Sequence, residues 1–124
     1  MSQPPTVQPI ALRLSLVLPT YNEAANLERI VGEIESAFAA AGLQSFEIIV
    51  VDDDSPDGTG AVADSLAAAS GGRVRAVHRL QERGLATAVV AGWKVARGEV
   101  LAAMDADGQH PPSVVPQLLA ALEE

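Results

Sequence analysis

The sequence has no cysteine, few aromatic residues and no long apolar run. The lack of cysteine excludes disulfide bridges and Cys-ligated zinc or iron–sulfur sites, so any metal must bind oxygen or histidine ligands. Aromatic residues make up only 3% of the 124 residues, whereas hydrophobic residues make up 48%, so the core must consist of small aliphatic side chains. Such a composition favours a single domain in which helices pack on a sheet.

Positive charge is also scarce. Eight Lys and Arg residues stand against 16 Asp and Glu residues, and the resulting formal net charge of −8 opposes binding to nucleic acid or to anionic lipid. The apolar run at residues 14–18 is far shorter than a membrane span and lacks the length and basic flank of a signal peptide. The chain is therefore expected to be soluble and cytoplasmic, with no nucleic acid partner.

Short apolar runs alternate with longer segments of helical period, which is typical of βαβ units around a parallel sheet. Residues 1–11, rich in Pro and Gln, are predicted to be a disordered lead-in. The predicted strands cover residues 14–18, 47–51, 74–78 and 100–104. The predicted helices run from Asn22 to Gly42, from Thr59 to Gly71, from Leu85 to Arg97, and from Ser113 onwards.

Polar residues concentrate where three of the predicted strands end. The first strand runs into PTYNE at residues 19–23, the second into DDDSPDGT at 52–59, and the fourth into DADGQH at 105–110. Six of the seven Asp residues lie in the last two segments. Because ligands of open α/β sheets bind beyond the carboxyl ends of the strands, these segments are predicted to form one site.

Asp105 and Asp107 are candidate metal ligands. Separated by one residue at a strand end, both carboxylates can turn toward one ion, and Gln109 can add a neutral carbonyl oxygen. Crowded carboxylates repel one another, and a divalent cation would relieve that repulsion. Oxygen ligation by few protein groups suits Mg²⁺ or Mn²⁺. The alternative is an acidic surface turn, which the position after an apolar strand makes less favourable.

Tyr21 and the acidic run at residues 52–54 suggest a nucleotide pocket. A flat aromatic ring beside carboxylate acceptors would suit the edge of a base and its ribose. Taken singly, Tyr21 is equally well explained as a strand-end aromatic, and Asn22 and Glu23 as residues that start a helix. The residues alone leave both interpretations open.

Four segments, PTYNE, VVDDDSPDGT, RGLATAVVAG and MDADGQHPP, follow one another in an order and spacing that resemble a known family. They look like the N-terminal half of family-2 inverting glycosyltransferases, closest to the polyprenol-phosphate (dolichol-phosphate) mannosyltransferases. The resemblance implies a Rossmann-like nucleotide-diphospho-sugar transferase (GT-A) fold of the α/β class, truncated, with helices on both faces of a parallel sheet. Residues 12–124 would then be the nucleotide-sugar-binding half of a glycosyltransferase domain.

The resemblance also implies roles for individual residues. The nucleoside would be held by Pro19, Tyr21, Glu23, Val51 and Asp53. The metal and the diphosphate would be held by Asp105, Ala106, Asp107 and Gln109, with Asp105 and Asp107 as the catalytic pair and Ala106 also contacting the nucleotide.

Four further positions bear on this assignment. Arg79 and Arg83 either approach the phosphates or are solvated loop residues. Gly108 and Ser113 depart from the family pattern, which usually has a bulky apolar residue at the first position and an acidic residue at the second. The glycine is expected to loosen the metal-binding loop.

The function implied is metal-dependent transfer of a hexose to polyprenyl phosphate with inversion, expected to use mannose from GDP-mannose. Such an acceptor would place the protein peripherally at the cytoplasmic face of a membrane. Two alternatives stay open: a non-catalytic nucleotide-binding fragment, or a transferase that uses a UDP-sugar and a saccharide acceptor. Family members continue for about as long again, so a C-terminal half or a second polypeptide is expected to complete the acceptor site.

Overall fold

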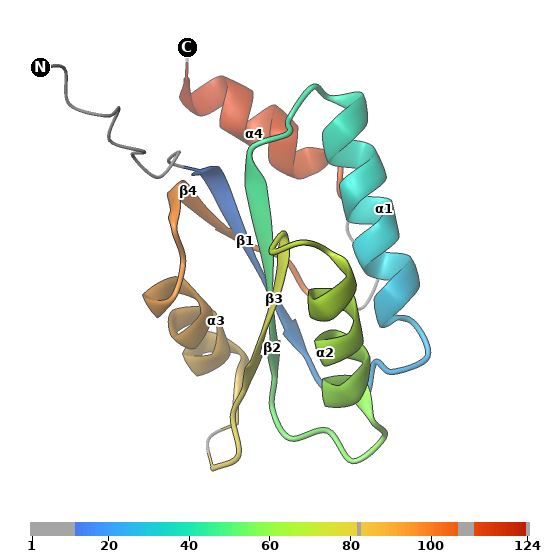
Figure 1. The fold of residues 1–124 in the computed structure, drawn as a ribbon. Helices are drawn as coiled ribbons and strands as arrows, with labels where there is room; N and C mark the ends of the chain where they lie inside the picture. The colour runs from blue at the N-terminus through green and yellow to red at the C-terminus, as the bar shows by residue number, and fades with distance from the viewer. Residues whose placement is uncertain (1–11, 82, 107–110, 124) are drawn as a thin grey trace, which may run out of the picture.

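The structure is a computed structural model that describes residues 12–81, 83–106 and 111–123. Strands and helices alternate along the chain (Figure 1). In order they are β1 (Leu12–Thr20), α1 (Leu27–Ala40), β2 (Phe46–Asp52), α2 (Thr59–Ala69), β3 (Val74–His78), α3 (Leu85–Lys94), β4 (Gly98–Ala103) and α4 (Val114–Leu122). The predicted lead-in, residues 1–11, lies outside the described residues.

The strands form one parallel sheet in the order β3-β2-β1-β4. The chain therefore builds outward from β1 through β2 to β3, and then crosses back to place β4 on the other side of β1. Parallel strands end at the same edge, so β1, β2, β3 and β4 share one carboxyl edge, toward which β1, β2 and β3 run downward in Figure 1. The predicted parallel α/β architecture is confirmed.

Helices cover both faces of the sheet. Alternate residues of β1, such as Leu16 and Leu18, pack with α1 and α4 in the larger hydrophobic core, whereas Val17 points to the other face and packs with Ala88 of α3. Figure 1 shows α3 alone on that second face. The contact is close: a Cβ built on Gly92 of α3 would lie 2.6 Å from a methyl carbon of Val17.

The first helix starts later than predicted. Its N-cap is Asn26 rather than Asn22, because Asn22 has φ of 56° and its N–H is bonded to Ser55, in the loop that precedes the helix. The predicted end is confirmed. Gly42 has φ of 77°, and the N–H of Leu43 donates to the carbonyl of Phe38 at 2.9 Å, the arrangement of a Schellman cap.

The third helix ends earlier than predicted, at Lys94 instead of Arg97. The reason is that Gly98 does not stop the helix but begins β4, where it pairs with Leu12 of β1. The last helix agrees with the prediction: Ser113 is its N-cap, and Pro116 stands third, where a missing N–H costs no helical hydrogen bond. Among the described helices, none has the length and apolar character needed to cross a membrane.

Candidate functional site

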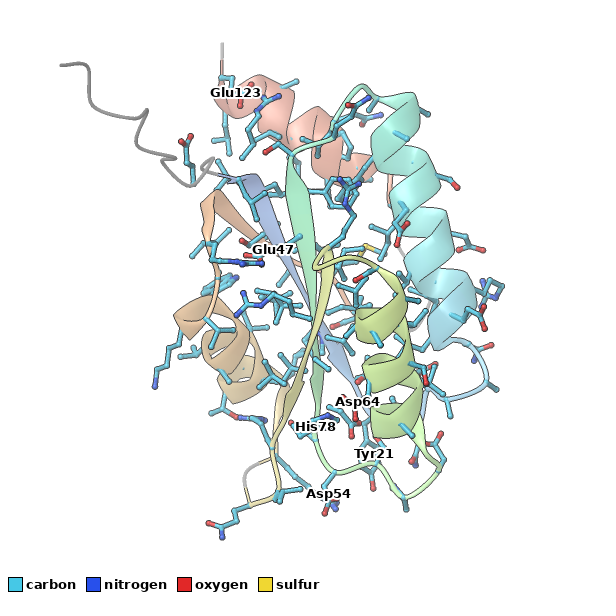
Figure 2. The ribbon with its side chains drawn as sticks, in the orientation of Figure 1. Tyr21, Glu47, Asp54, Asp64, His78 and Glu123 are labelled. Atoms are coloured by element: carbon cyan, nitrogen blue, oxygen red, sulfur yellow. The ribbon has the colours of Figure 1, made fainter. Side chains whose placement is uncertain are left out.

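Two of the three predicted polar segments, those after β1 and β2, meet at the carboxyl edge of the sheet. Figure 2 shows Tyr21 and Asp54, which follow β1 and β2, at the same end as His78 of β3. The segments after β1 and β2 are also bonded together, because three successive backbone N–H groups donate to side chains of the second segment. These bonds are Asn22 N–H to Ser55 Oγ (3.0 Å), Glu23 N–H to Thr59 Oγ1 (2.9 Å) and Ala24 N–H to Asp57 Oδ2 (3.1 Å).

Asp57 is the residue at the centre of this connection. Its carboxylate accepts the Thr59 hydroxyl at 2.5 Å and the Thr59 N–H at 3.0 Å, in addition to the N–H of Ala24. The Thr59 hydroxyl, above all, holds the pKa of Asp57 below its usual value, and the two N–H groups act in the same direction while burial opposes them. Asp57 therefore fixes how the loop that carries Tyr21 lies against α2.

Asp57→Asn is expected to weaken the fold at neutral pH, because an amide has only one acceptor oxygen. It therefore cannot accept the hydrogen bonds of both Ala24 and Thr59, which use different carboxylate oxygens. A lowered folded-state pKa adds stability above the unfolded value of about 3.8, and this contribution disappears as the pH falls through the folded-state pKa. The urea midpoints of the parent and the variant should therefore differ at pH 7 and converge only as the pH falls through the folded-state pKa, which lies below ~3.8. Asp54→Asn is the control, since it removes one charge from the same loop at an exposed position with φ of 56° that Asn tolerates. An equal loss of stability in both variants would contradict the role of Asp57.

A pocket of about 320 Å³ opens beside these loops. It lies between the end of β1, the end of β2 and the first turn of α3. Its lining consists of Pro19, Thr20, Tyr21, Asp53, Arg83, Gly84, Leu85 and Ala88. The structure thus brings together three of the residues predicted to hold a nucleoside, namely Pro19, Tyr21 and Asp53.

Asp53 is held in place by Arg79. The guanidinium of Arg79 donates two parallel hydrogen bonds to the Asp53 carboxylate, at 2.7 and 2.9 Å, and the N–H of Gly84 adds a third at 3.2 Å. Both residues are 8% exposed. A carboxylate offers about four acceptor positions, so these three bonds leave one for a ligand in the pocket.

Tyr21 and Arg83 also line the pocket. Tyr21 is 45% exposed, and the Arg83 guanidinium lies 5.2 Å from the centre of its ring, within the range of a cation–π contact. Arg83 therefore places a positive charge at the pocket wall, next to a flat aromatic surface. This arrangement can receive both a planar base and an anionic group.

A second pocket of about 330 Å³ adjoins the first through Leu85, which lines both. Asp105 lies in this second pocket, at the end of β4, together with apolar residues of α3 and α4. The other predicted site residues are placed differently. Glu23, Val51 and Ala106 line neither pocket, and Val51 and Ala106 are buried in the core. Asp107 and Gln109 lie outside the described residues.

In the part of the chain that the structure describes, no three or more His, Cys, Asp or Glu side chains are grouped so as to hold a metal ion. Asp105 is the one predicted ligand described here. The ion site therefore stays a prediction that depends on Asp107 and Gln109.

Sequence reasoning did not anticipate the partnership between Arg79 and Asp53. A signal for it was present, because Arg79 directly follows β3 in the sequence and β3 is the neighbour of β2, whose end carries Asp53. A basic residue and an acidic residue at the ends of neighbouring parallel strands are close enough to pair.

Comparison with known proteins identifies the family of this chain. The family described as Glycosyl transferase family 2 matches residues 15–124. Among curated relatives, the dolichol-phosphate mannosyltransferase of Pyrococcus furiosus is 46% identical over 90% of this chain and 30% of its own length. The polyprenol monophosphomannose synthase of Mycolicibacterium smegmatis is 46% identical over 97% of this chain and 44% of its own length.

Comparison with solved structures agrees with this family assignment. A mannosyltransferase from Pyrobaculum calidifontis, solved in complex with GDP-Man and Mn²⁺, is 28% identical with a TM-score of 0.71, covering 98% of this chain and 35% of that one. The mannosyl-3-phosphoglycerate synthase of Rubrobacter xylanophilus is 30% identical with a TM-score of 0.64, covering 80% of this chain and 32% of that one. The chain thus has the GT-A fold, spans less than half the length of these relatives, and belongs to glycosyl transferase family 2.

Proposed function

We propose that the site at the carboxyl edge binds the nucleotide part of GDP-mannose. The observation that carries the proposal is the 320 Å³ pocket in which the ring of Tyr21 and the anchored carboxylate of Asp53 face the same space. The ring offers a flat surface for a base, and Asp53 keeps an acceptor position for a base or ribose donor. The mannosyltransferase with bound GDP-Man, whose fold covers 98% of this chain, supports guanine over other bases.

The diphosphate is proposed to lie between the two pockets, near Arg83 and Asp105. Arg83 supplies a positive charge in the lining of the 320 Å³ pocket, which we call the base pocket. Asp105 lines the second pocket, which shares the lining residue Leu85 with the base pocket. Asp105, Asp107 and Gln109 would hold Mg²⁺ or Mn²⁺, an assignment that fits their oxygen ligands and the Mn²⁺ in the Pyrobaculum enzyme. A bound divalent cation supplies Lewis-acid stabilisation of the departing diphosphate.

For the whole protein we propose transfer of mannose to a polyprenyl phosphate, with inversion at the anomeric carbon. The names of the two curated relatives quoted above support this acceptor. A phosphate acceptor is already anionic near neutral pH, so attack from the face opposite the diphosphate needs no strong general base. The acceptor would bring the protein to a membrane surface, which we place at the cytoplasmic face.

Calorimetric titration with GDP-mannose in Mn²⁺ tests the donor site. Binding is expected to weaken at least about tenfold, or ~1.4 kcal/mol, when EDTA is added or when Asp107 is replaced in Asp107→Ala. Glu99→Gln serves as the control, because it removes a negative charge from an exposed position of β4 and should bind like the parent. UDP should bind more weakly than GDP. Equal affinity for GDP-mannose under all these conditions would eliminate the metal site, and equal affinity for UDP would eliminate the preference for guanine.

A further inference from the structure

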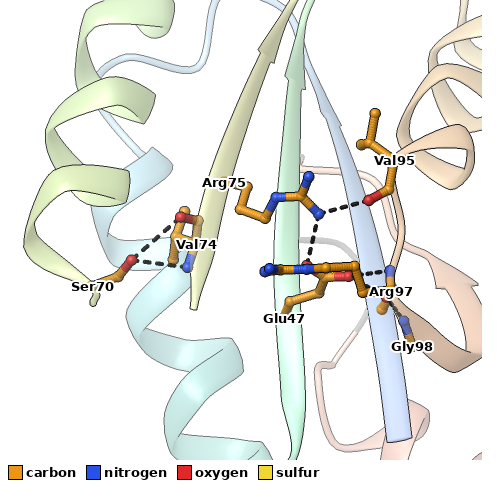
Figure 3. Close-up of polar contacts among 8 residues, drawn as sticks. Glu47, Ser70, Val74, Arg75, Val95, Arg97 and Gly98 are labelled. Carbon is orange, nitrogen blue, oxygen red and sulfur yellow. Dashed lines mark hydrogen bonds and ion pairs between the residues drawn. The ribbon is translucent and has the colours of Figure 1, made fainter. Parts of the chain in front are cut away.

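A buried carboxylate lies on the sheet away from the pocket. Glu47, the second residue of β2, has a side chain that is only 1% exposed and points to the face that α3 covers (Figure 3). It is six residues before Asp53 on the same extended stretch, so it lies about 20 Å from the pocket at ~3.3 Å per residue. Neither pocket at the carboxyl edge includes it.

The two oxygens of Glu47 have different partners. Oε1 accepts hydrogen bonds from the guanidinium groups of Arg75, at 3.0 Å, and Arg97, at 3.1 and 3.2 Å. Oε2 accepts the hydroxyl of Ser15 at 2.6 Å and the backbone N–H of Arg97 at 2.7 Å. Burial raises the pKa of Glu47, but these hydrogen bonds outweigh it and hold the pKa below its usual value. Glu47 is therefore a carboxylate at neutral pH.

The bonds on Oε2 continue into β4. Ser15 of β1 donates to Glu47 and also accepts the backbone N–H of Gly98 at 2.8 Å. Two consecutive N–H groups at the entry to β4, those of Arg97 and Gly98, are thus received by side chains of β2 and β1 (Figure 3). We call Ser15 and Glu47 the strand clamp.

Gly98, the first residue of β4, also has no room for a side chain. A Cβ built on Gly98 would lie 2.6 Å from the carbonyl carbon of Leu14 and 2.6 Å from the nitrogen of Ser15. The backbone of β4 therefore comes so close to β1 that only glycine fits there. The clamp and this contact together fix which residue of β4 faces which residue of β1.

Register matters at the other end of β4, where Asp105 lies. A slip of one residue turns every side chain of a strand to the opposite face. The described pairing runs from Gly98 opposite Leu12 to Ala103 opposite Val17, and the N–H of Met104 then donates to the carbonyl of Val17 at 3.0 Å. Asp105 follows directly and lines the second pocket in this register.

We propose that the strand clamp, Ser15 and Glu47, positions Asp105 by fixing the register of β4, so that two residues remote from the ligand control metal-dependent binding of the nucleotide. This inference rests on the proposed function. In it Ser15 and Glu47 are positioning residues, since neither touches the donor, and the base pocket built on β1, β2 and α3 does not depend on them.

The test compares guanosine with GDP in the presence and absence of Mn²⁺, using Ser15→Ala and Glu47→Met of the 124-residue chain. In both variants, the factor by which Mn²⁺ raises the affinity for GDP is expected to fall at least tenfold. The affinity for guanosine is expected to change less than twofold. Glu47→Gln keeps one acceptor oxygen and should recover part of the gain. Glu99→Gln, an exposed change on the same strand, should keep all of it.

Amide hydrogen exchange supplies a second readout that needs no ligand. Loss of the clamp should accelerate exchange in β4 at least tenfold more than in β2, whereas a general loss of stability would accelerate both alike. Any of three results would overturn the proposed role of the clamp. They are an equal loss of guanosine and GDP binding, an unchanged Mn²⁺ dependence of GDP binding in Glu47→Met, and equal acceleration of amide exchange in β4 and β2. If the parent chain shows no Mn²⁺-dependent binding, the proposed function fails, and the exchange pattern alone decides the clamp. Should Ser15→Ala not fold, Glu47→Met and Glu47→Gln give the same decision.

Discussion

The Asp53→Ala substitution is expected to destabilise the fold by about 3–5 kcal/mol, the cost of removing one partner of a buried ion pair. Asp53 and Arg79 are each 8% exposed and are joined by two parallel hydrogen bonds of 2.7 and 2.9 Å. The substitution removes the negative charge beside a guanidinium that has little access to water. It also removes the acceptor for the Gly84 N–H at the start of α3. Denaturant unfolding measures the loss directly.

The same variant should bind nucleotide more weakly, by about 1–3 kcal/mol for one lost hydrogen bond to a buried donor. The affinity for nucleotide is measured without denaturant, at a temperature at which the variant remains folded. Asp54→Asn is the matched control, because it neutralises the neighbouring carboxylate at an exposed position whose φ of 56° Asn tolerates. Asp53→Ala with unchanged stability would show that the pair with Arg79 contributes nothing. Unchanged affinity for GDP would show that Asp53 does not face the nucleoside.

The 124-residue chain alone is expected to bind GDP-mannose but to transfer little or no mannose. The matched relatives are more than twice as long, since the chain covers 30% and 44% of the two curated relatives. Rate enhancement requires both substrates to be held in register, and positioning contributes roughly 7–11 kcal/mol to lowering the barrier. A chain that holds only the donor loses most of that contribution. The assay is transfer of radiolabelled mannose to polyprenyl phosphate in detergent.

The control for this assay is the full-length polyprenol monophosphomannose synthase of M. smegmatis, measured beside the short chain. Activity should appear when the short chain is extended, or complemented in trans, by the remaining length of such a relative. Turnover by the 124 residues alone at a rate comparable to the relative would show that they contain the acceptor site. That result would contradict the claim that this segment supplies the donor site alone.

The fold could largely be predicted from the sequence because parallel strands buried on both faces leave a clear apolar signal. The strand at residues 74–78 has the predicted bounds, and the polar segments after β1 and β2 do gather at one edge. Element boundaries were wrong where tertiary contacts decide them. The start of α1 moved to Asn26 because Asn22 to Ala24 are bonded to the segment after β2, a contact that local propensity does not contain.

The site was predicted only in part for the same reason. Tyr21 and Asp53 could be placed in one pocket because both follow neighbouring strands. The side-chain pairing of Asp53 with Arg79 depends on β3 lying next to β2, and the order of the strands in the sheet was not predicted. Likewise, Glu47 lies in a strand that was predicted correctly, yet nothing in the sequence indicated that its charge is buried against Ser15 and Arg97.

Nuclear magnetic resonance of the isotopically labelled chain tests the location of the donor site most directly. Titration with GDP-mannose and Mg²⁺, followed by trace Mn²⁺, reports on each backbone amide. The account predicts that the largest shift changes fall in residues 19–24, 52–59 and 83–88, and that Mn²⁺ broadens the signals nearest to Asp105 most strongly. Shift changes confined to other parts of the chain, or Mn²⁺ broadening centred away from Asp105, would contradict a nucleotide-sugar site at the carboxyl edge of this sheet.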